Sequence, residues 1–586
     1  MTDSESMQSN RDKILRIIAA NAAKYGKPNL KAVMGKVMAE IPEMRQNPKE
    51  AMEIVRNLIS EFESLDETAK KRLLEGVEEG VEEKKVVKEP HLPPLEGAEE
   101  GVVMRFAPNP NGPPTLGSAR GIIVNSEYVK MYGGKFVLRF DDTDPRTKRP
   151  MLEAYDWYLE DCEWLDAKPD EVVYASKRIS MYYDYLVNLL EMGKAYPCFC
   201  SQAEFKKYRD AGQECPHRNT PVEDALEVWE KMLEGAYREG EVAVRIKTDM
   251  RHRDPAIRDW VAFRIIYASH PLVGDAYHVY PTLDFESAIE DHVLGITHIL
   301  RGKDLMDSER RQKYIYQYFG WEYPITKLWG KVSIFEFGKL STSQLRKEVE
   351  AGRYRGWDDV RLPTIKAFRR RGFKAEAIRK FFLSLGVSEN DVSVSLKNLY
   401  AENRKLVDRE ANRYFFVADP VKIVIEGLEE VKEVEIPLRP ETDAFRTLKG
   451  EREVYIASSD WNRFKKGDIF RLKEFCNVEV VGEGREGEDE EGRAGKVRFV
   501  SWEPGEVKKG KNIIHWVPVS EAVKCTVEGV DRDYQGYAER NAISDVGRVV
   551  QFERFAFCRI EKIESVEKLE GLEETNTVLK CVYTHP

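Results

Sequence analysis

Residues 105–121 read R-F-A-P-N-P-N-G-P-P-T-L-G-S-A-R-G. An apolar segment ends at Arg105–Phe106, a proline-rich loop follows, and a helix is predicted to begin near Leu116. Loops at the carboxyl ends of parallel strands are where α/β sheets bind ligands. The amide N–H groups at the helix start favour phosphates, and Gly117 leaves the backbone open to a flat ligand. An ordinary proline-rich turn is the alternative.

The segments on either side of this loop have the pattern of a parallel α/β sheet. Residues 101–106 are predicted to form a strand, residues 116–131 a helix and residues 135–140 a second strand. Strand, helix and strand in this order are the repeating unit of such a sheet. The same pattern returns at residues 279–300, so the segment from Tyr196 to about Ser269 is predicted to be an insertion in the sheet.

Two charged motifs follow further along the chain. The second predicted strand ends in Asp141-Asp142-Thr143-Asp144-Pro145. Like charges repel, so we expect a cation, a bound ammonium group or a helix start to compensate these carboxylates; for Asp144 alone, a helix cap is the simpler alternative. Gly338-Lys339-Leu340-Ser341-Thr342-Ser343 provides a lysine and hydroxyl groups that can hold a departing pyrophosphate.

The two ends of the chain have different sequence patterns. Residues 12–74 show helical periodicity, with Asn47 as a predicted cap and Pro48 at the first position of a helix. Residues 78–100 have the composition of a linker. After about Asp408, short alternating runs predict the strands of a β-barrel. These runs include 453–457, 468–472, 477–481, 497–502 and 512–517.

The composition is that of a globular protein, with 42% hydrophobic and 33% charged residues over 586 positions. A chain of this length is expected to form several domains. No apolar run is long enough for a membrane helix, and the N-terminus lacks the apolar segment of a secretion signal, so we expect a cytoplasmic protein. The net charge of −10 argues only weakly against a nucleic-acid partner, because a basic surface such as Arg369-Arg370-Arg371 can be local.

Together these motifs resemble the class I aminoacyl-tRNA synthetases of the glutamyl/glutaminyl group. Thr115-Leu116-Gly117-Ser118 stands where that family has its HIGH motif, and residues 339–343 stand where it has KMSKS. Residues 280–285, 295–298 and 356–373 resemble stretches of glutaminyl enzymes and of archaeal and eukaryotic glutamyl enzymes. The resemblance covers residue 101 to the C-terminus. It implies attachment of an amino acid to tRNA through an aminoacyl-adenylate, with ATP and Mg²⁺.

The resemblance also implies roles for individual residues. Arg105 matches an arginine beside the amino-acid side chain, and Asp141 matches the acidic residue that holds the α-ammonium group. The other positions implied for the amino-acid site are Ala107, Asn109, Leu283, Ser287 and Arg301. Those implied for ATP and the chemical step are Pro108, Asn109, Pro110, Gly112, Thr115, Leu116, Gly117 and Ser118, together with Lys339, Leu340, Ser341, Thr342 and Ser343.

Arg301 stands where the family divides, because glutamyl enzymes have arginine here and glutaminyl enzymes a small neutral residue. A buried γ-carboxylate needs a paired cation, which guanidinium supplies with two donors. Facing a neutral amide, that cation would be left partly unpaired at a cost of roughly 3 kcal/mol or more. We therefore expect glutamate as the substrate. The alternatives are glutamine as substrate, a tRNA-binding relative with weak catalysis, and an Arg301 that only pairs with Asp304 or another local carboxylate.

Several positions depart from the family pattern. Thr115 and Ser118 replace both histidines of the HIGH motif, and Thr342 replaces the second lysine of KMSKS. Hydroxyl groups can donate to ATP phosphates, but they carry no charge. Leu283 replaces an aromatic residue and Ser287 a larger polar one.

Cys198-Phe199-Cys200 and Cys215-Pro216-His217 form two close pairs of metal-binding side chains. Three thiols and an imidazole suit tetrahedral zinc, and a closed set of four ligands makes the site structural rather than catalytic. Reduced thiols beside a surface histidine are the alternative. The other five of the eight cysteines are scattered and are expected to be free thiols.

The predicted architecture is a Rossmann-type α/β catalytic core with an acceptor-binding insertion, an N-terminal helical domain and a C-terminal β-barrel domain. By the resemblance, the insertion binds the tRNA acceptor stem, and the barrels bind the anticodon. Asp307, which lies outside the insertion, matches a further position that contacts the acceptor stem. We expect a monomer that binds L-glutamate and tRNA(Glu), with tRNA(Gln) left open. The predicted boundaries are 1–76 (helical domain), 77–100 (linker), 101–195 and 271–330 (core halves), 196–270 (insertion), 331–408 (KMSKS-like loop and helical connection) and 409–586 (barrels).

Overall fold

The computed structural model describes residues 3–25, 28–41, 44, 48–65, 92–338, 342–440, 442–483, 494–504, 512–566 and 576–586. The chain divides into two compact units, Met1–Glu89 and Pro90–Pro586. Most of the predicted linker, and Lys339, Leu340 and Ser341 of the KMSKS-like loop, lie outside the described residues. Within the described residues, no helix is both long and apolar enough to cross a membrane.

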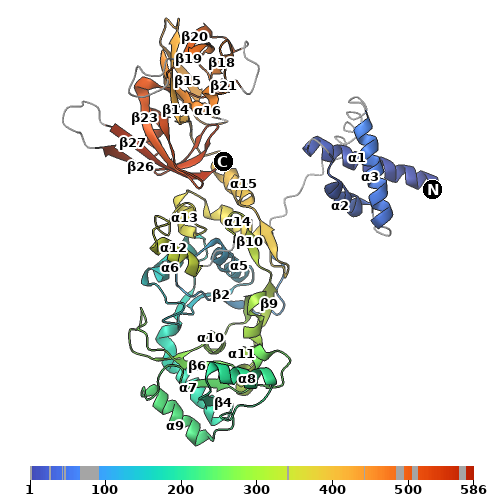
Figure 1. Ribbon diagram of the computed structural model, residues 1–586, viewed down its shortest axis with the longest axis vertical. Helices are drawn as coiled ribbons and strands as arrows, with labels where there is room; N and C mark the ends of the chain where they lie inside the picture. The colour runs from blue at the N-terminus through green and yellow to red at the C-terminus, as the bar shows by residue number, and fades with distance from the viewer. Residues whose placement is uncertain are drawn as a thin grey trace. The chain divides into compact units, whose positions relative to one another are not determined.

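The N-terminal unit is helical, as its periodicity predicts. Its described helices are α1 (Asp3–Tyr25), α2 (Leu30–Glu40) and α3 (Pro48–Ser64), drawn in blue in Figure 1. Their core includes Ile14, Ile18, Val33, Val37 and Val55. Helix α3 begins at Pro48, where the missing N–H of proline removes no helical hydrogen bond. The predicted cap Asn47 lies outside the described residues.

The core of the second unit is a parallel sheet with the strand order β3-β2-β1-β8-β9. These strands are β1 (Val102–Phe106), β2 (Gly134–Phe140), β3 (Glu171–Tyr174), β8 (His298–Gly302) and β9 (Ile325–Trp329). The chain runs outward from β1 to β3 and then returns to β8 on the other side of β1. The order therefore reverses between β1 and β8, and ligands bind at such a point, outside the carboxyl ends of the strands. This is the Rossmann-type core that the sequence predicts.

Helices cover this sheet and carry residues to its carboxyl edge. They are α5 (Leu116–Tyr132), α6 (Leu152–Trp164), α10 (Leu283–Val293) and α11 (Met306–Phe319). Helix α5 lies so close to β1 that a Cβ on Gly121 would come within 2.5 Å of the Phe106 ring. Glycine is therefore needed where this helix crosses the strand.

An antiparallel sheet interrupts the core between β3 and β8, where the sequence predicts an insertion. Its order is β4-β5-β6-β7, and its strands are β4 (Ala195–Cys198), β5 (Ala243–Ile246), β6 (Val261–Ile265) and β7 (Val279–Pro281). The helices α7 (Ile179–Glu191), α8 (Gln202–Ala211) and α9 (Val222–Leu233) accompany it at the lower end of Figure 1. The apolar core of this insertion includes Trp229 and Phe263 and continues into α10 through Phe285 and Ile289.

A mixed segment then leads toward the C-terminal part. It contains a parallel pair of strands, β10 (Val332–Ile334) and β11 (Val392–Val394). Its helices are α12 (Thr342–Glu350), α13 (Ile365–Arg370), α14 (Ala375–Leu385) and α15 (Leu396–Val407).

The C-terminal part is built from strands, as predicted. Its described residues form two seven-stranded sheets, β12-β25-β26-β27-β23-β24-β13 and β21-β18-β19-β20-β14-β17-β22, and a two-stranded β15–β16 ribbon. The bounds are β12 (Arg413–Tyr414), β13 (Phe416–Ala418), β14 (Pro420–Glu426), β15 (Lys432–Pro437), β16 (Phe445–Gly450), β17 (Glu453–Ala457), α16 (Ser458–Trp461), β18 (Ile469–Leu472), β19 (Asn477–Glu483), β20 (Ala494–Ser501), β21 (Ile513–Ile514), β22 (Val517–Pro518), β23 (Ala522–Glu528), β24 (Tyr534–Glu539), β25 (Val549–Phe552), β26 (Ala556–Val566) and β27 (Asn576–His585). The single strand predicted at 512–517 is wrong. It is two strands, because β21 pairs with β18 and β22 pairs with β17.

The arginine run at the end of α13 connects this helical segment to these sheets. Arg371 is buried, and its Nη2 donates to the carbonyl oxygen of Thr584 at 2.6 Å. Arg370 Nη2 donates to Glu528 at 2.8 Å. The prediction of a basic surface at residues 369–371 is therefore wrong for these two side chains, which have partners on β23 and β27.

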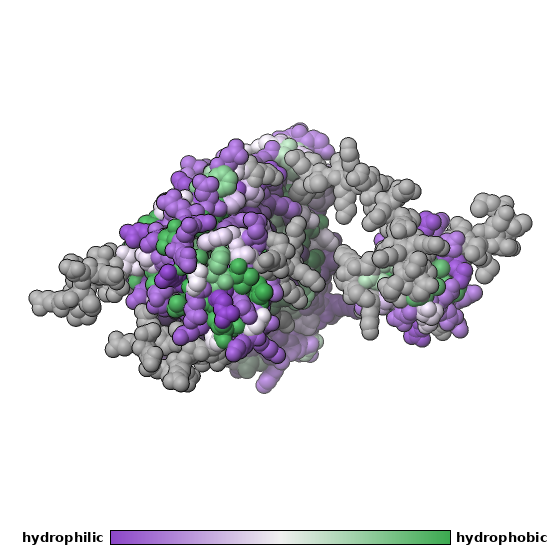
Figure 2. Space-filling view, turned by 90° about the horizontal axis from the view of Figure 1, so that it is seen from above, coloured by the Kyte–Doolittle hydropathy of each residue, from purple (hydrophilic) through white to green (hydrophobic). Residues whose placement is uncertain are grey.

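On the face seen in Figure 2, hydrophilic residues cover most of the described surface, with hydrophobic residues in small groups between them.

Candidate active site

A cavity of about 320 Å³ opens at the carboxyl ends of β1 and β8, where the strand order reverses. Its lining includes Arg105, Ala107, Asp141, Leu283, Ser287 and Arg301, all assigned to the amino-acid site from the sequence. The remaining assigned residue, Asn109, lies beside Asp141, and its Nδ2 donates to the Asp141 carbonyl at 3.1 Å. The Asn109 Oδ1 is buried and has no donor among the described residues.

Two further residues, Arg139 and Asp291, connect Arg105 to Asp141. Nε and Nη2 of Arg105 donate to the two Asp291 carboxylate oxygens at 3.0 and 3.1 Å. Arg139 donates through Nη1 to Asp291 and through Nε to Asp141, both at 2.6 Å, and through Nη2 to Ser287 Oγ at 2.8 Å. Two guanidinium groups and two carboxylates thus form one buried network whose charges sum to zero.

Burial and pairing act in opposite directions on this network. Burial alone would lower the pKa of Arg139, but Asp141 and Asp291 hold it well above its ordinary value. Burial alone would raise the pKa of Asp291, but Arg105 and Arg139 hold it below its ordinary value. Arg139 and Asp291 therefore stay charged at neutral pH. Glu286, on the same helix as Asp291, differs: burial raises its pKa well above the ordinary value, which favours its neutral form.

Arg301 reaches the same cavity from the end of β8, and among the described residues it has no carboxylate partner. Its Nη2 donates to Gln312 Oε1 at 2.9 Å and to the Tyr323 hydroxyl at 3.2 Å. Its Nη1 is buried without a hydrogen-bond partner in the described part of the chain. Asp304, the alternative partner considered above, is exposed at the rim of the cavity. A guanidinium that is only 5% exposed and keeps one nitrogen free is arranged for an anionic ligand.

The three carboxylates after β2 have separate partners. Asp141 belongs to the buried network and lines the cavity. Asp142 is buried and accepts from the Tyr155 hydroxyl at 2.6 Å, and burial raises its pKa. Asp144 accepts from the backbone N–H of Thr147 at 2.8 Å. Its other oxygen accepts from Arg264 Nη2 at 3.0 Å. The helix-cap alternative for Asp144 is therefore wrong, because the residues after it form a turn and a cation compensates its charge.

The proline-rich loop is fixed by backbone hydrogen bonds. The Pro108 carbonyl accepts from Asp141 N at 3.0 Å, and the Pro110 carbonyl accepts from Met151 N at 2.8 Å. Leu116 N, at the start of α5, donates to the Pro363 carbonyl at 2.9 Å. The loop is thereby held between the ends of neighbouring elements before any ligand binds.

Thr115 and Ser118 lie together at the N-terminus of α5. Thr115 is the N-cap residue, and its Oγ1 accepts from Ser118 N at 3.4 Å. The Ser118 hydroxyl lies 3.5 Å from Thr115 Oγ1. Gly117 is exposed, and a Cβ there would meet the Thr115 hydroxyl at 3.5 Å and no other described atom within 4 Å. Hydroxyl groups thus stand at the helix start, beside backbone that an anionic ligand can approach.

The described residues of the KMSKS-like motif lie against this loop. Asn111 Nδ2 donates to Ser343 Oγ at 3.2 Å. A Cβ on Gly112 would come within 2.6 Å of the Thr342 methyl group, so glycine permits the close approach. The structure therefore brings Thr342 and Ser343, at the start of α12, to the loop that precedes α5.

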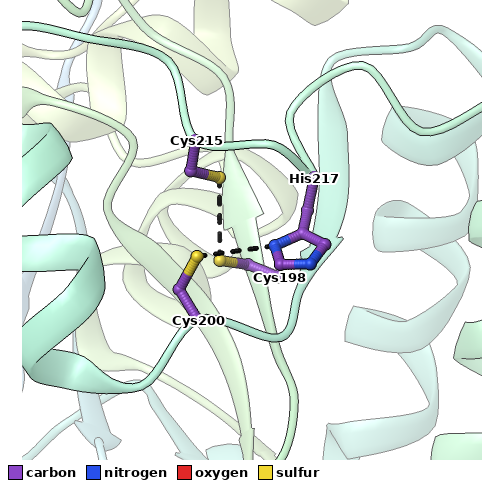
Figure 3. A group of neighbouring side chains, drawn as sticks. All are labelled: Cys198, Cys200, Cys215 and His217. Atoms are coloured by element: carbon purple, nitrogen blue, oxygen red, sulfur yellow. Dashed lines mark hydrogen bonds between the residues drawn. The ribbon is translucent and has the colours of Figure 1, made fainter.

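The four predicted metal ligands of the insertion also converge (Figure 3). Ligand atoms of Cys198, Cys200, Cys215 and His217 all lie within 4.8 Å of one another. The sulfur atoms of Cys198 and Cys215 are 3.9 Å apart, and Cys200 Sγ lies 3.5 Å from His217 Nδ1. Tetrahedral zinc would set these separations at about 3.8 and 3.6 Å, from bond lengths of about 2.3 Å to sulfur and 2.0–2.1 Å to nitrogen. The donor set and its spacing therefore fit zinc.

Asp307 lies apart from the cavity network, in the first turn of α11. Its side chain is exposed, and its Oδ1 accepts from Arg310 Nη1 at 3.4 Å. The position suits contact with a large partner rather than with an amino acid in the cavity.

Sequence reasoning did not assign Arg139, Asp291, Gln312 or Tyr323 to the site. A signal exists for two of them. Arg139 is a charge inside the apolar run Phe136–Phe140, and Asp291 follows Ser287 by one helical turn on a buried face. For Gln312 and Tyr323 the sequence carries no comparable signal.

Two family models match this chain, and related proteins match nearly its whole length. The catalytic domain described as tRNA synthetases class I (E and Q) matches residues 101–409, and the anti-codon binding domain of the same group matches residues 411–499. The glutamate–tRNA ligase of Archaeoglobus fulgidus is 65% identical over 577 residues, which is 98% of this chain and 100% of that protein. The protein of the same name from Methanosarcina barkeri is 54% identical, over 93% of this chain and 96% of that protein. The one from Pyrococcus furiosus is 50% identical, over 94% of this chain and 97% of that protein.

Proposed function

Because the chain belongs to the tRNA synthetases of class I (E and Q), we propose that it is a glutamate–tRNA ligase. The reaction joins L-glutamate to tRNA(Glu) through glutamyl-adenylate and converts ATP to AMP and diphosphate. The observation that carries the proposal is Arg301 Nη1, a buried guanidinium nitrogen at the cavity without a partner among the described residues.

The charges of the cavity favour glutamate over glutamine. The buried network of Arg105, Arg139, Asp141 and Asp291 sums to zero, so Arg301 contributes the net positive charge. Glutamate carries one net negative charge at neutral pH, whereas glutamine carries none. Glutamine would leave the buried Arg301 without a counter-charge, which is costly in a desolvated site.

The γ-carboxylate and the α-ammonium group of glutamate then each have a binding partner in the cavity. The γ-carboxylate binds Arg301 Nη1 in a charge-assisted hydrogen bond. The α-ammonium group is held by Asp141 and by Asn109 Oδ1, an acceptor that lacks a donor among the described residues. Leu283 and Ser287 line the wall between them.

In the first step, an oxygen of the α-carboxylate attacks the α-phosphorus of ATP in line, and the bond to the leaving pyrophosphate breaks. The N-terminus of α5 and the hydroxyl groups of Thr115, Ser118, Thr342 and Ser343 donate to the phosphates. Mg²⁺, when bound, neutralises part of their charge. No side chain acts as a nucleophile, so the protein contributes position and electrostatic stabilisation.

In the second step, the terminal ribose 2′-hydroxyl of tRNA attacks the carbonyl carbon of the adenylate, and AMP leaves. Asp307 on α11 contacts the acceptor stem. The C-terminal sheets bind the anticodon, whose bases are read by stacking and by hydrogen bonds to their edges.

We also propose a structural zinc ion held by Cys198, Cys200, Cys215 and His217. The fit of the sulfur and nitrogen separations to tetrahedral zinc supports it. We expect one zinc per chain by metal analysis, its loss in Cys198→Ser and a lower melting temperature of that variant. The control is Cys162→Ser, which changes a buried thiol outside the cluster and keeps the metal. Absence of zinc from the purified wild type would reject the site.

The proposed function is tested by ATP–pyrophosphate exchange and by aminoacylation, both with tRNA present, because relatives of this subgroup generally need tRNA for the first step. We expect activity with glutamate and tRNA(Glu), and little with glutamine. Adding tRNA(Gln) in a separate reaction decides whether the enzyme discriminates between the two tRNAs. No exchange with either amino acid would favour a tRNA-binding relative instead.

A further inference from the structure

Arg301 is held in place by two uncharged groups. Gln312 on α11 is 1% exposed, and its Oε1 accepts from Arg301 Nη2 at 2.9 Å and from the Tyr323 hydroxyl at 2.6 Å. The Tyr323 oxygen in turn accepts from Arg301 Nη2 at 3.2 Å. An arginine can only donate, so the amide of Gln312 must present its oxygen to it. The three side chains therefore form a closed triangle with one consistent set of donors and acceptors.

The absence of charge in this triangle has a consequence for the substrate. Glutamate in place of Gln312 would have nearly the same shape and would bind the guanidinium more strongly. However, its carboxylate would also cancel the charge of Arg301. Among the nearby carboxylates, Asp291 is bound by Arg105, and Glu309 pairs with Lys313 at 2.7 Å. Asp304 is exposed to solvent at the rim of the cavity. The positive charge of Arg301 is thus not compensated by the groups that hold it, because Gln312 and Tyr323 are neutral.

We propose that Gln312 and Tyr323 are positioning residues that set the preference of this cavity for a γ-carboxylate over a γ-carboxamide. They fix Nη2 of Arg301 with uncharged acceptors. The positive charge of Arg301 and its Nη1 donor therefore remain available to bind the substrate. The inference rests on the proposed glutamate–tRNA ligase function and extends it to the choice between acid and amide.

The decisive variant is Gln312→Glu, which changes charge but hardly changes shape. Because the new carboxylate pairs with Arg301, the KM for glutamate should rise about 100-fold, and kcat and the KM for ATP should change far less. The ratio of kcat/KM for glutamate to that for glutamine should fall by about the same factor, because the neutral substrate meets no new repulsion. Both quantities come from exchange assays with tRNA present.

Neutral variants separate charge from shape. Gln312→Met and Tyr323→Phe each remove hydrogen bonds to Arg301 but leave its charge, so we expect a rise of about tenfold or less in the KM for glutamate and a preserved glutamate-to-glutamine ratio. Gln317→Glu is the matched control. It makes the same substitution on an exposed position of the same helix and should change neither quantity.

A double variant completes the test. With Arg301→Met in place, adding Gln312→Glu should lower the ratio no further, because the charge that it cancels is already gone. The inference is overturned if Gln312→Glu leaves the ratio unchanged, or if Gln312→Met lowers it as much. A wild type that activates neither amino acid would instead defeat the proposed function. Thermal melting of each variant identifies any loss that is due to unfolding.

Discussion

The two ends of the amino-acid cavity use charge in opposite ways. At the end formed by β1 and β2, Arg105 and Asp141 are both satisfied within the protein, through Asp291 and Arg139. At the β8 end, Arg301 is equally buried but is held by neutral groups and keeps one nitrogen free. The first arrangement fixes geometry, and the second leaves a charge for a ligand.

This difference shows why an arginine at a binding site is not by itself a specificity residue. A buried guanidinium that is fully paired gives the substrate little net attraction, because its field is compensated nearby. The sequence places both Arg105 and Arg301 beside the amino-acid side chain. The bidentate pairing of Arg105 with Asp291 assigns the net charge of the cavity to Arg301 instead.

The largest effect is expected at the free end. Arg301→Met should lower kcat/KM for glutamate about 1000-fold, or about 4 kcal/mol of transition-state stabilisation, because the γ-carboxylate loses the guanidinium whose Nη1 has no partner among the described residues. The KM for ATP should stay within about threefold, since the phosphates bind elsewhere. Steady-state exchange kinetics measure both. Equal losses for glutamate and ATP would mean that Arg301 is structural.

At the paired end, a change should act first on the fold. Asp291→Asn leaves the buried charges of Arg105 and Arg139 partly uncompensated, so we expect the free energy of unfolding to fall by about 3 kcal/mol. Urea unfolding followed by tryptophan fluorescence measures this. The glutamate-to-glutamine ratio of the folded fraction should not fall, because Arg301 and the remaining network keep their positive charges. If that ratio collapses while stability is unchanged, the roles assigned to the two ends are reversed.

Asp161 on α6 is paired on one side only, which places it between the fully paired Asp291 and the partly unpaired Arg301. One of its carboxylate oxygens binds Arg369 at 2.8 Å, and the other is buried without a partner among the described residues. Burial raises its pKa to about 6, against the lowering effect of Arg369. The folded state therefore binds the proton more tightly than the unfolded state, and stability falls as pH rises from about 4 to about 6.

Compared with Asp161→Asn, the wild type should lose about 2–3 kcal/mol of unfolding free energy between pH 4 and pH 7. Asp156→Asn, on an exposed position of the same helix, is the control and should show no such trend. A pH-independent difference between wild type and Asp161→Asn would show that Arg369 fully compensates the carboxylate. Urea unfolding at a series of pH values provides the measurement.

Much of the fold was predictable, because its signals are local. The apolar strands around the loop, the first helix after it and the paired spacing of the metal ligands are all patterns within short segments. The strand at 512–517 was predicted wrongly for a non-local reason, since its two halves pair with different strands. The arginine run at 369–371 was misjudged in the same way, because its partners lie far along the chain on β23 and β27.

The site was predictable where residue type alone carries the chemistry. A lone arginine before a glycine, or an aspartate after a strand, points to a charged ligand whatever surrounds it. The neutral partners of Arg301 were not predictable, because Gln312 and Tyr323 are unremarkable in sequence until the fold brings α11 and the segment before β9 against β8. Pairing is likewise a property of the folded state, so the neutralisation of Arg105 by Asp291 could not be foreseen.

The most direct measurement of the central claim is a structure with a non-hydrolysable glutamyl-adenylate analogue bound. We predict a γ-carboxylate oxygen about 2.8 Å from Arg301 Nη1, with Nη2 still bound by Gln312 and Tyr323. A γ-carboxylate bound to Arg105 instead, with Asp291 displaced and Arg301 Nη1 left without a partner, would contradict it.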